Sequence, residues 1–100
     1  MQSINATSIV NSVLTVAQNT AEEFDISEFN TPDKRILLMP EAGATFHILF
    51  TKETETTDAD ADDFLIPSTG FDVVIRSRIG RISVFNSSSG SKKLYIATMQ

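Results

Sequence analysis

The chain has no cysteine and no tryptophan, and its 100 residues include one tyrosine, one histidine, four glycines and three prolines. Without cysteine there are no disulfides and no thiolate chemistry, so stability must come from the core or from neighbouring subunits. No apolar run approaches the roughly 20 residues needed to span a bilayer. The first six residues place no base before an apolar stretch, so we expect no signal peptide there.

Charge is unevenly distributed along the chain, whose net charge is −5. Residues 1–51 carry −4, residues 52–70 carry −5, and residues 71–100 carry +4. The acidic and basic parts are either complementary, within one fold or between subunits packed head to side, or simply solvated surfaces. Net acidity argues against binding to duplex nucleic acid, and we expect neither a nucleic acid nor a membrane as partner.

One pattern occurs twice. Residues 38–48 (LMPEAGATFHI) and 65–75 (LIPSTGFDVVI) each have an apolar end, a Pro-x-x-Gly corner and an alternating apolar run. Proline fixes φ at the start of the corner, and glycine accepts a positive φ at its end, so the chain reverses and leaves extended. The repeat therefore favours a compact antiparallel β domain.

Alternation of apolar and polar residues extends this prediction to the rest of the chain. A helix is the alternative for residues 8–17, because Ile9, Val13 and Val16 also share a helical stripe. We predict a small antiparallel β-sandwich or jelly roll spanning residues 8–100, with residues 1–7 as an N-terminal arm and a partly open barrel as the alternative. The predicted short strands, about eight in number, are 8–17, 24–26, 35–39, 46–51, 64–66, 71–75, 82–85 and 94–99.

Three connections have recognisable compositions. Residues 52–63 contain six acids and no large apolar residue, so we expect a solvated, mobile loop with nothing buried. Ile79-Gly80 predicts a bend or bulge, and residues 86–91 (NSSSGS) predict a hairpin loop.

The sequence offers little that would carry out a reaction. Asp58, Asp60 and Asp62 match the start of an EF-hand loop, but the glycine and the closing glutamate that such a loop needs are Asp63 and Thr69 here. His47 lies mid-strand, on the face opposite Phe46 and Ile48, and lacks the partners for zinc or for a nucleophilic serine. We therefore predict a non-enzymatic protein with no cofactor, metal or catalytic residue.

The basic stretch at residues 76–81 is the best candidate for binding another protein. In an extended segment Arg76 and Arg78 share one side, an arrangement suited to carboxylates, and Arg81 follows closely. The alternative is an exposed strand edge kept soluble by its charge. Together with Ile4 and Ile9 of the N-terminal segment, these arginines are the predicted protein-interaction residues.

Residues 38–99 resemble small virion proteins of tailed bacteriophages. The similar segments are the corner Ile66-Pro67-Ser68-Thr69-Gly70, the run RISVFN at residues 81–86 before a Ser/Gly turn, and the closing strand KLYIA at residues 93–97. The resemblance implies a virion protein made in the host cytoplasm, such as a capsid decoration or cement protein on the major capsid shell. A neck or tail adaptor, a fibre-base protein and a carbohydrate-binding module are alternatives. We also expect a homo-oligomer, with a trimer as the expected form.

Overall fold

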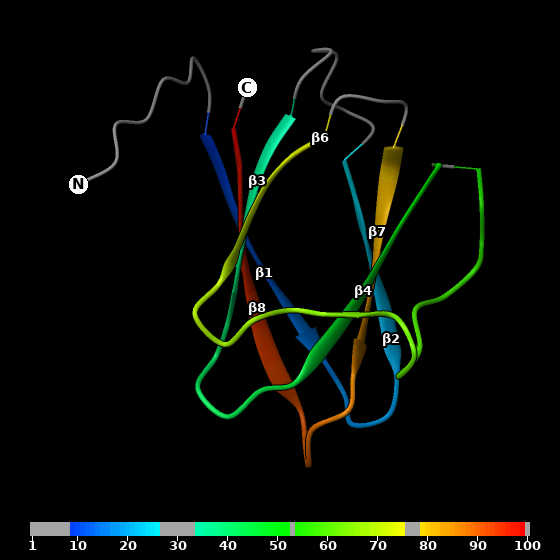
Figure 1. The fold of residues 1–100 in the computed structure, drawn as a ribbon, viewed down its shortest axis with the longest axis vertical. Coiled ribbons are helices and arrows are strands. Elements are labelled where there is room, and N and C mark those ends of the chain that lie inside the picture. Colours follow the sequence, from blue (N-terminus) through cyan, green and yellow to red (C-terminus); the bar gives the residue numbers. More distant parts are fainter. Residues whose placement is uncertain (1–8, 27–33, 53, 76–78, 100) are drawn as a thin grey trace.

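The computed structural model describes residues 9–26, 34–52, 54–75 and 79–99, which form an all-β sandwich (Figure 1). The eight-strand prediction is confirmed, including the strand rather than the helix at the N-terminal end. The strands are β1 (Ile9–Val16), β2 (Ala21–Asp25), β3 (Lys34–Pro40), β4 (Phe46–Lys52), β5 (Phe64–Leu65), β6 (Phe71–Ile75), β7 (Ile79–Asn86) and β8 (Lys92–Met99).

The strands form two four-stranded antiparallel sheets. The first sheet has the order β1-β8-β3-β6 and the second the order β2-β7-β4-β5. β1 pairs with β8, β2 with β7, β3 with β6 and β4 with β5, as if the chain were folded in half and then rolled up. This is the topology of a jelly roll, and it is a sandwich of two sheets rather than the partly open barrel.

Both Pro-x-x-Gly corners carry the chain from one sheet to the other, in opposite directions. The first joins β3 to β4 and the second joins β5 to β6. Gly43 and Gly70 have φ values of +83° and +103°, in the region that favours glycine. Both turns are four residues long, but they start at different positions of the Pro-x-x-Gly pattern. In the first turn the Ala44 amide donates to the Glu41 carbonyl, one residue after the proline, whereas in the second the Gly70 amide donates to the carbonyl of Pro67 itself.

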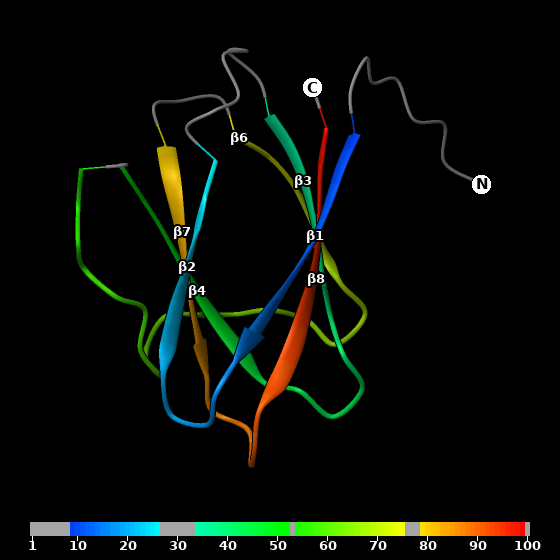
Figure 2. The same ribbon diagram turned by 180° about the vertical axis from the view of Figure 1, so that it is seen from behind.

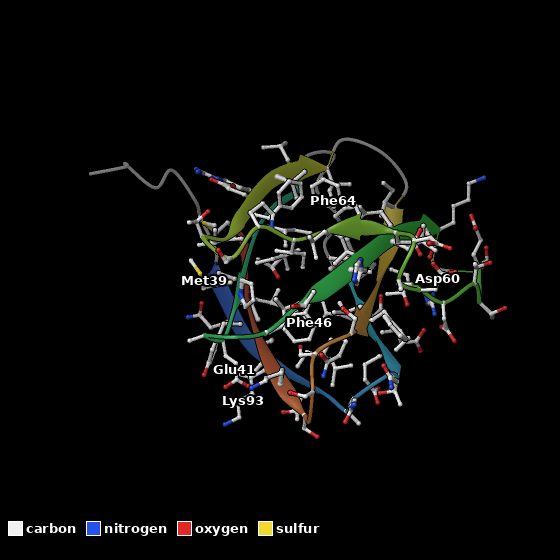
Figure 3. All side chains as sticks on the ribbon, turned by 60° about the horizontal axis from the view of Figure 1, so that its bottom comes forward. Met39, Glu41, Phe46, Asp60, Phe64 and Lys93 are labelled. Atoms are coloured by element: carbon white, nitrogen blue, oxygen red, sulfur yellow. The ribbon has the colours of Figure 1, made fainter. Side chains whose placement is uncertain are left out.

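The core fills the space between the sheets, where Phe46 lies (Figure 3). Alternation places every second residue of each strand inward, so both sheets contribute to one cluster. Its members are Val16, Ile26, Ile36, Leu38, Phe46, Ile48, Ile66, Ile75, Ile82, Val84, Leu94 and Ile96.

Two sequence predictions about connections have different outcomes. The bulge is confirmed, because Lys52 pairs with Ile79 and Thr51 with Arg81, which leaves Gly80 unmatched. The hairpin at residues 86–91 is wrong, because β7 belongs to the second sheet and β8 to the first. Asn86 is also not a loop residue: its fully buried amide donates to the carbonyls of Val16 and Gly90, at 2.8 and 2.9 Å.

Candidate interaction surfaces

The outer face of the second sheet is covered by residues 54–63, which we call the acidic loop. In Figures 1 and 2 this loop lies beside β4 and β7, on the side away from the first sheet. Its principal anchor is Arg81 on β7, whose side chain is only 7% exposed. The guanidinium donates to Glu23 at 2.5 Å, to Asp58 at 2.8 Å and to the Thr57 carbonyl at 2.6 Å. These contacts, above all the hydrogen bond to Glu23, raise the pKa of Arg81.

A second anchor lies beside the first. The buried Ser83 hydroxyl accepts a hydrogen bond from the Ala59 amide at 2.8 Å, and Ala59 is itself buried. The prediction that nothing in this loop is buried is therefore wrong. The reason is that alanine is small enough to lie flat on the sheet, while the acids beside it point into solvent or pair with Arg81. Arg81, Ile82, Ser83 and Val84 are consequently all buried, on both faces of β7.

His47 and Ser87 form a pair at the edge of this covered face. His47 Nδ1 lies 3.1 Å from the Asp63 carbonyl, which can only accept, so in the neutral ring Nε2 accepts from the Ser87 hydroxyl at 3.0 Å. A catalytic serine also needs amide donors for the developing oxyanion. The Ser87 amide already donates to the Thr45 carbonyl, and the Ser88 amide to the Asn86 side chain. Both amides are thus already hydrogen-bonded within the chain. The His47–Ser87 pair, with the contact from His47 to the Asp63 carbonyl, ties the end of the acidic loop to β4 and to the segment after β7.

The outer face of the first sheet has no such cover among the described residues. Val13, Tyr95 and Met39 are cross-strand neighbours there, forming one apolar row across β1, β8 and β3. Val13 is 55% and Tyr95 45% exposed. Leu37 and Ala97 form the apolar part of the next row and are half-buried. We call the surface made by these five residues the open face.

The open face is hollowed. A depression of about 340 Å³ lies over it, lined by the five residues together with Asn11, Ser12 and Ile96. An exposed apolar surface with a polar rim is typical of a protein-binding site.

Charged residues border the open face on two sides. Arg35 on β3 and Asp72 on β6 form a two-pronged ion pair, with Nε–Oδ1 and Nη2–Oδ2 distances of 3.0 and 2.6 Å. The hydrogen bonds to Arg35 lower the pKa of the Asp72 carboxyl. At the other end the Lys93 amide donates to the Glu41 carboxylate at 2.6 Å, and Figure 3 shows these residues side by side.

The sequence-predicted interaction residues are mostly not placed at this surface. Ile4, Arg76 and Arg78 lie outside the described residues, as does the predicted arm at residues 1–7. Ile9 begins β1, where its backbone pairs with Met99. Arg81 is described, and its guanidinium is used entirely within the chain, so it is not available to a partner while the acidic loop is in place.

Sequence reasoning missed the open face, although one signal pointed to it. Residues 36–39 (ILLM) are an unbroken apolar run, which indicates a strand that is apolar on both faces rather than half-solvated. Such a run does not say which of its two faces is covered by the rest of the chain.

Within the described ranges no three His, Asp or Glu residues gather closely enough to hold a metal ion, the aspartates of the acidic loop included. No helix of the described residues has the length and hydropathy required to cross a bilayer. Comparisons of the chain with protein-family models, with curated proteins and with solved structures found no match.

Proposed function

We propose that this chain is a non-enzymatic structural protein that works by adhesion, and in its most specific form a capsid decoration or cement protein of a tailed bacteriophage. The observation that carries the proposal is the difference between its two outer faces: one is closed by the protein's own loop, and the other is an open apolar surface. A protein that acts by binding other proteins needs such a surface and does not need a reaction centre.

The chemistry of the open face supports protein binding. Its centre contains an aromatic residue and a methionine, both of which are enriched in protein interfaces, and its charged residues lie at the border. Tyr95 is rigid and amphipathic, and it lies in the middle row of the face, between Val13 and Met39. Residues of this kind in this position typically supply most of the binding energy of an interface.

Co-sedimentation tests the proposal. The protein is mixed with expanded capsids assembled from the major capsid protein of the same genome and centrifuged, with free protein as the reference. We expect saturable pelleting that Tyr95→Ser weakens at least tenfold, because the substitution removes the central apolar side chain while leaving the exposed position polar. Ser89→Ala, in the exposed connection after β7, is the matched control and should pellet like the wild type. Absence of pelleting at every salt concentration would overturn the capsid role.

A carbohydrate-binding module is the second candidate, and one observation favours it. Tyr95, the chain's one tyrosine, lines the depression together with Asn11, so a sugar ring could stack on an aromatic face beside a hydrogen-bonding group. Stabilisation of the protein against heat by a panel of oligosaccharides, lost in Tyr95→Ser, would establish this function instead.

A further inference from the structure

We propose that the open face of one copy receives the acidic side of a second copy, so that copies associate head to tail. By acidic side we mean Phe64 and Leu65 of β5 with Asp60 and Asp62 of the adjoining loop, all of them exposed. The inference rests on the proposed function, since it names the occupant of the same surface.

The two sheets differ in net charge. The strands of the first sheet contain four bases against one acid, a net charge of +3, whereas the strands of the second sheet and the acidic loop contain eight acids against two bases, a net charge of −6. Arg35 and Lys93 border the open face, but each lies beside an acid, Asp72 and Glu41, so the charge difference is one between the two sheets as a whole. Two first sheets brought together would oppose like net charges. An open face and an acidic side bring opposite charges together, which steers the encounter and penalises the alternative.

The acidic side also contains exposed apolar residues. Phe64 and Leu65 are 53% and 52% exposed, an unusual position for two adjacent large apolar residues. Phe64 packs its ring against Phe71 at a centroid distance of 5.0 Å, while Leu65 lies opposite His47 on the outer face of the second sheet. Because consecutive strand residues point to opposite faces, Leu65 is the residue of β5 that projects from the outer surface near the acids, and the open face presents an apolar depression with charged residues at its border.

The two surfaces lie on different sides of one copy. The open face is the outer surface of the first sheet and Leu65 lies on the outer surface of the second, so the two cannot meet within one copy. Figure 3 shows Met39 and Asp60 on opposite sides of the molecule. Contacts between two different surfaces are heterologous, and they continue from copy to copy until a ring closes.

The available area sets the strength of one contact. Four strands about 4.8 Å apart and about six residues at 3.3 Å each give about 400 Å² for the whole outer surface of the first sheet, of which the open face is a part. A pair of copies would then bury at most about 800 Å², which is less than most stable complexes bury. A single contact is therefore weak, and larger assemblies form where a ring closes or where a capsid lattice holds the copies side by side.

Sedimentation velocity with two variants and their mixture tests the inference. Val13→Asp places an acid on the open face, and Leu65→Asp removes the apolar projection; Ser89→Asp adds the same charge elsewhere and is the control. At low salt and up to about 1 mM protein, which reveals dissociation constants in the millimolar range, we expect wild type and control to self-associate and added salt to weaken this. Each variant alone should remain monomeric. An equimolar mixture should form dimers and nothing larger, because the intact acidic side of the Val13→Asp variant can bind the intact open face of the Leu65→Asp variant and no other intact contact remains.

The other outcomes overturn the inference in distinguishable ways. If Leu65→Asp associates like the wild type while Val13→Asp does not, open faces pair with each other. If the wild type is monomeric, or the mixture is, no head-to-tail contact exists. Capsid pelleting that depends on Tyr95 without self-association would leave the proposed function intact and remove only this inference. Self-association without any pelleting would leave this inference intact and remove the proposed capsid role.

Discussion

The two outer faces of this sandwich are built by the same kind of strand and yet differ in what lies over them. On the second sheet, polar side chains of β7 point outward and are buried under the acidic loop. On the first sheet, the corresponding outward positions of β8 are Tyr95 and Ala97, and no described residue lies over Tyr95. A covered face tolerates an arginine and a serine because the loop's backbone and carboxylates satisfy their hydrogen bonds. An uncovered apolar face gains nothing within the monomer, which is why we assign it to association.

Two arginines show the same difference at the level of single contacts. Arg35 and Arg81 each bind carboxylates with short hydrogen bonds, but Arg35 and Asp72 are about one-third exposed whereas Arg81 is 7% exposed. Solvent reaches both members of the first pair, whereas at Arg81 it reaches the carboxylates of Glu23 and Asp58, which are 66% and 67% exposed, but not the buried guanidinium. The larger cost of losing Arg81 is therefore expected from that buried guanidinium and from its hydrogen bond to the Thr57 carbonyl, not from the ion pairs alone.

Replacing Arg81 should have the largest effect on stability, because this residue holds the acidic loop over the second sheet. We expect Arg81→Leu to lower the free energy of unfolding by about 2 kcal/mol, since it removes charge-assisted hydrogen bonds and leaves the Thr57 carbonyl without its donor. Urea unfolding at pH 7 measures the loss, and faster hydrogen exchange of the Ala59 amide would show that the loop has come away. Arg35→Leu is the matched variant on the open face and should cost much less. Equal losses of stability in the two variants would mean that the acidic loop contributes nothing to the stability of the fold.

Thr98 lies beneath the open face and offers a smaller effect of opposite sign. It is fully buried on the inner side of β8, and its hydroxyl is the one buried side-chain oxygen in the described ranges that has no hydrogen-bond partner. Thr98→Val replaces that hydroxyl with a methyl group of similar size, so we expect a gain of about 1 kcal/mol in thermal or urea unfolding. The contrasting variant is Ser83→Ala, which takes the acceptor from the Ala59 amide and should lower stability by a similar amount. A loss of stability in Thr98→Val would contradict the assignment of the Thr98 hydroxyl as unpaired.

The Arg35–Asp72 pair should give the smallest effect, one that is present near neutral pH and lost in acid. Because the pKa of Asp72 is lowered below its ordinary value of 3.8, the pair stabilises the fold above that pH and the contribution disappears as pH falls through the lowered value. Unfolding of wild type and Asp72→Asn should therefore differ at pH 6 and converge in strong acid, with a difference smaller than the gain in Thr98→Val. A difference independent of pH would exclude the carboxylate as its source.

Particular residues show how far the sequence carried the fold and the site. Alternation located all eight strands, and the glycine at residue 80 predicted the bulge, since both depend on neighbours along the chain. The hairpin at residues 86–91 failed because a Ser/Gly connection looks the same whether it joins paired strands or crosses between sheets. Arg81 was expected at a surface because nothing local reveals that Glu23, 58 residues away, and Asp58, 23 residues away, enclose it.

The amino-acid sequence by itself determined which residues extend, where the chain turns and which alternate side chains leave water, because backbone restriction and period-two hydrophobicity are local properties. Only the tertiary structure decided which outward face would be covered. That outcome depends on contacts between residues far apart in the chain, where Arg81 and Ser83 hold a loop over one sheet and no described residue does so for the apolar row of the other.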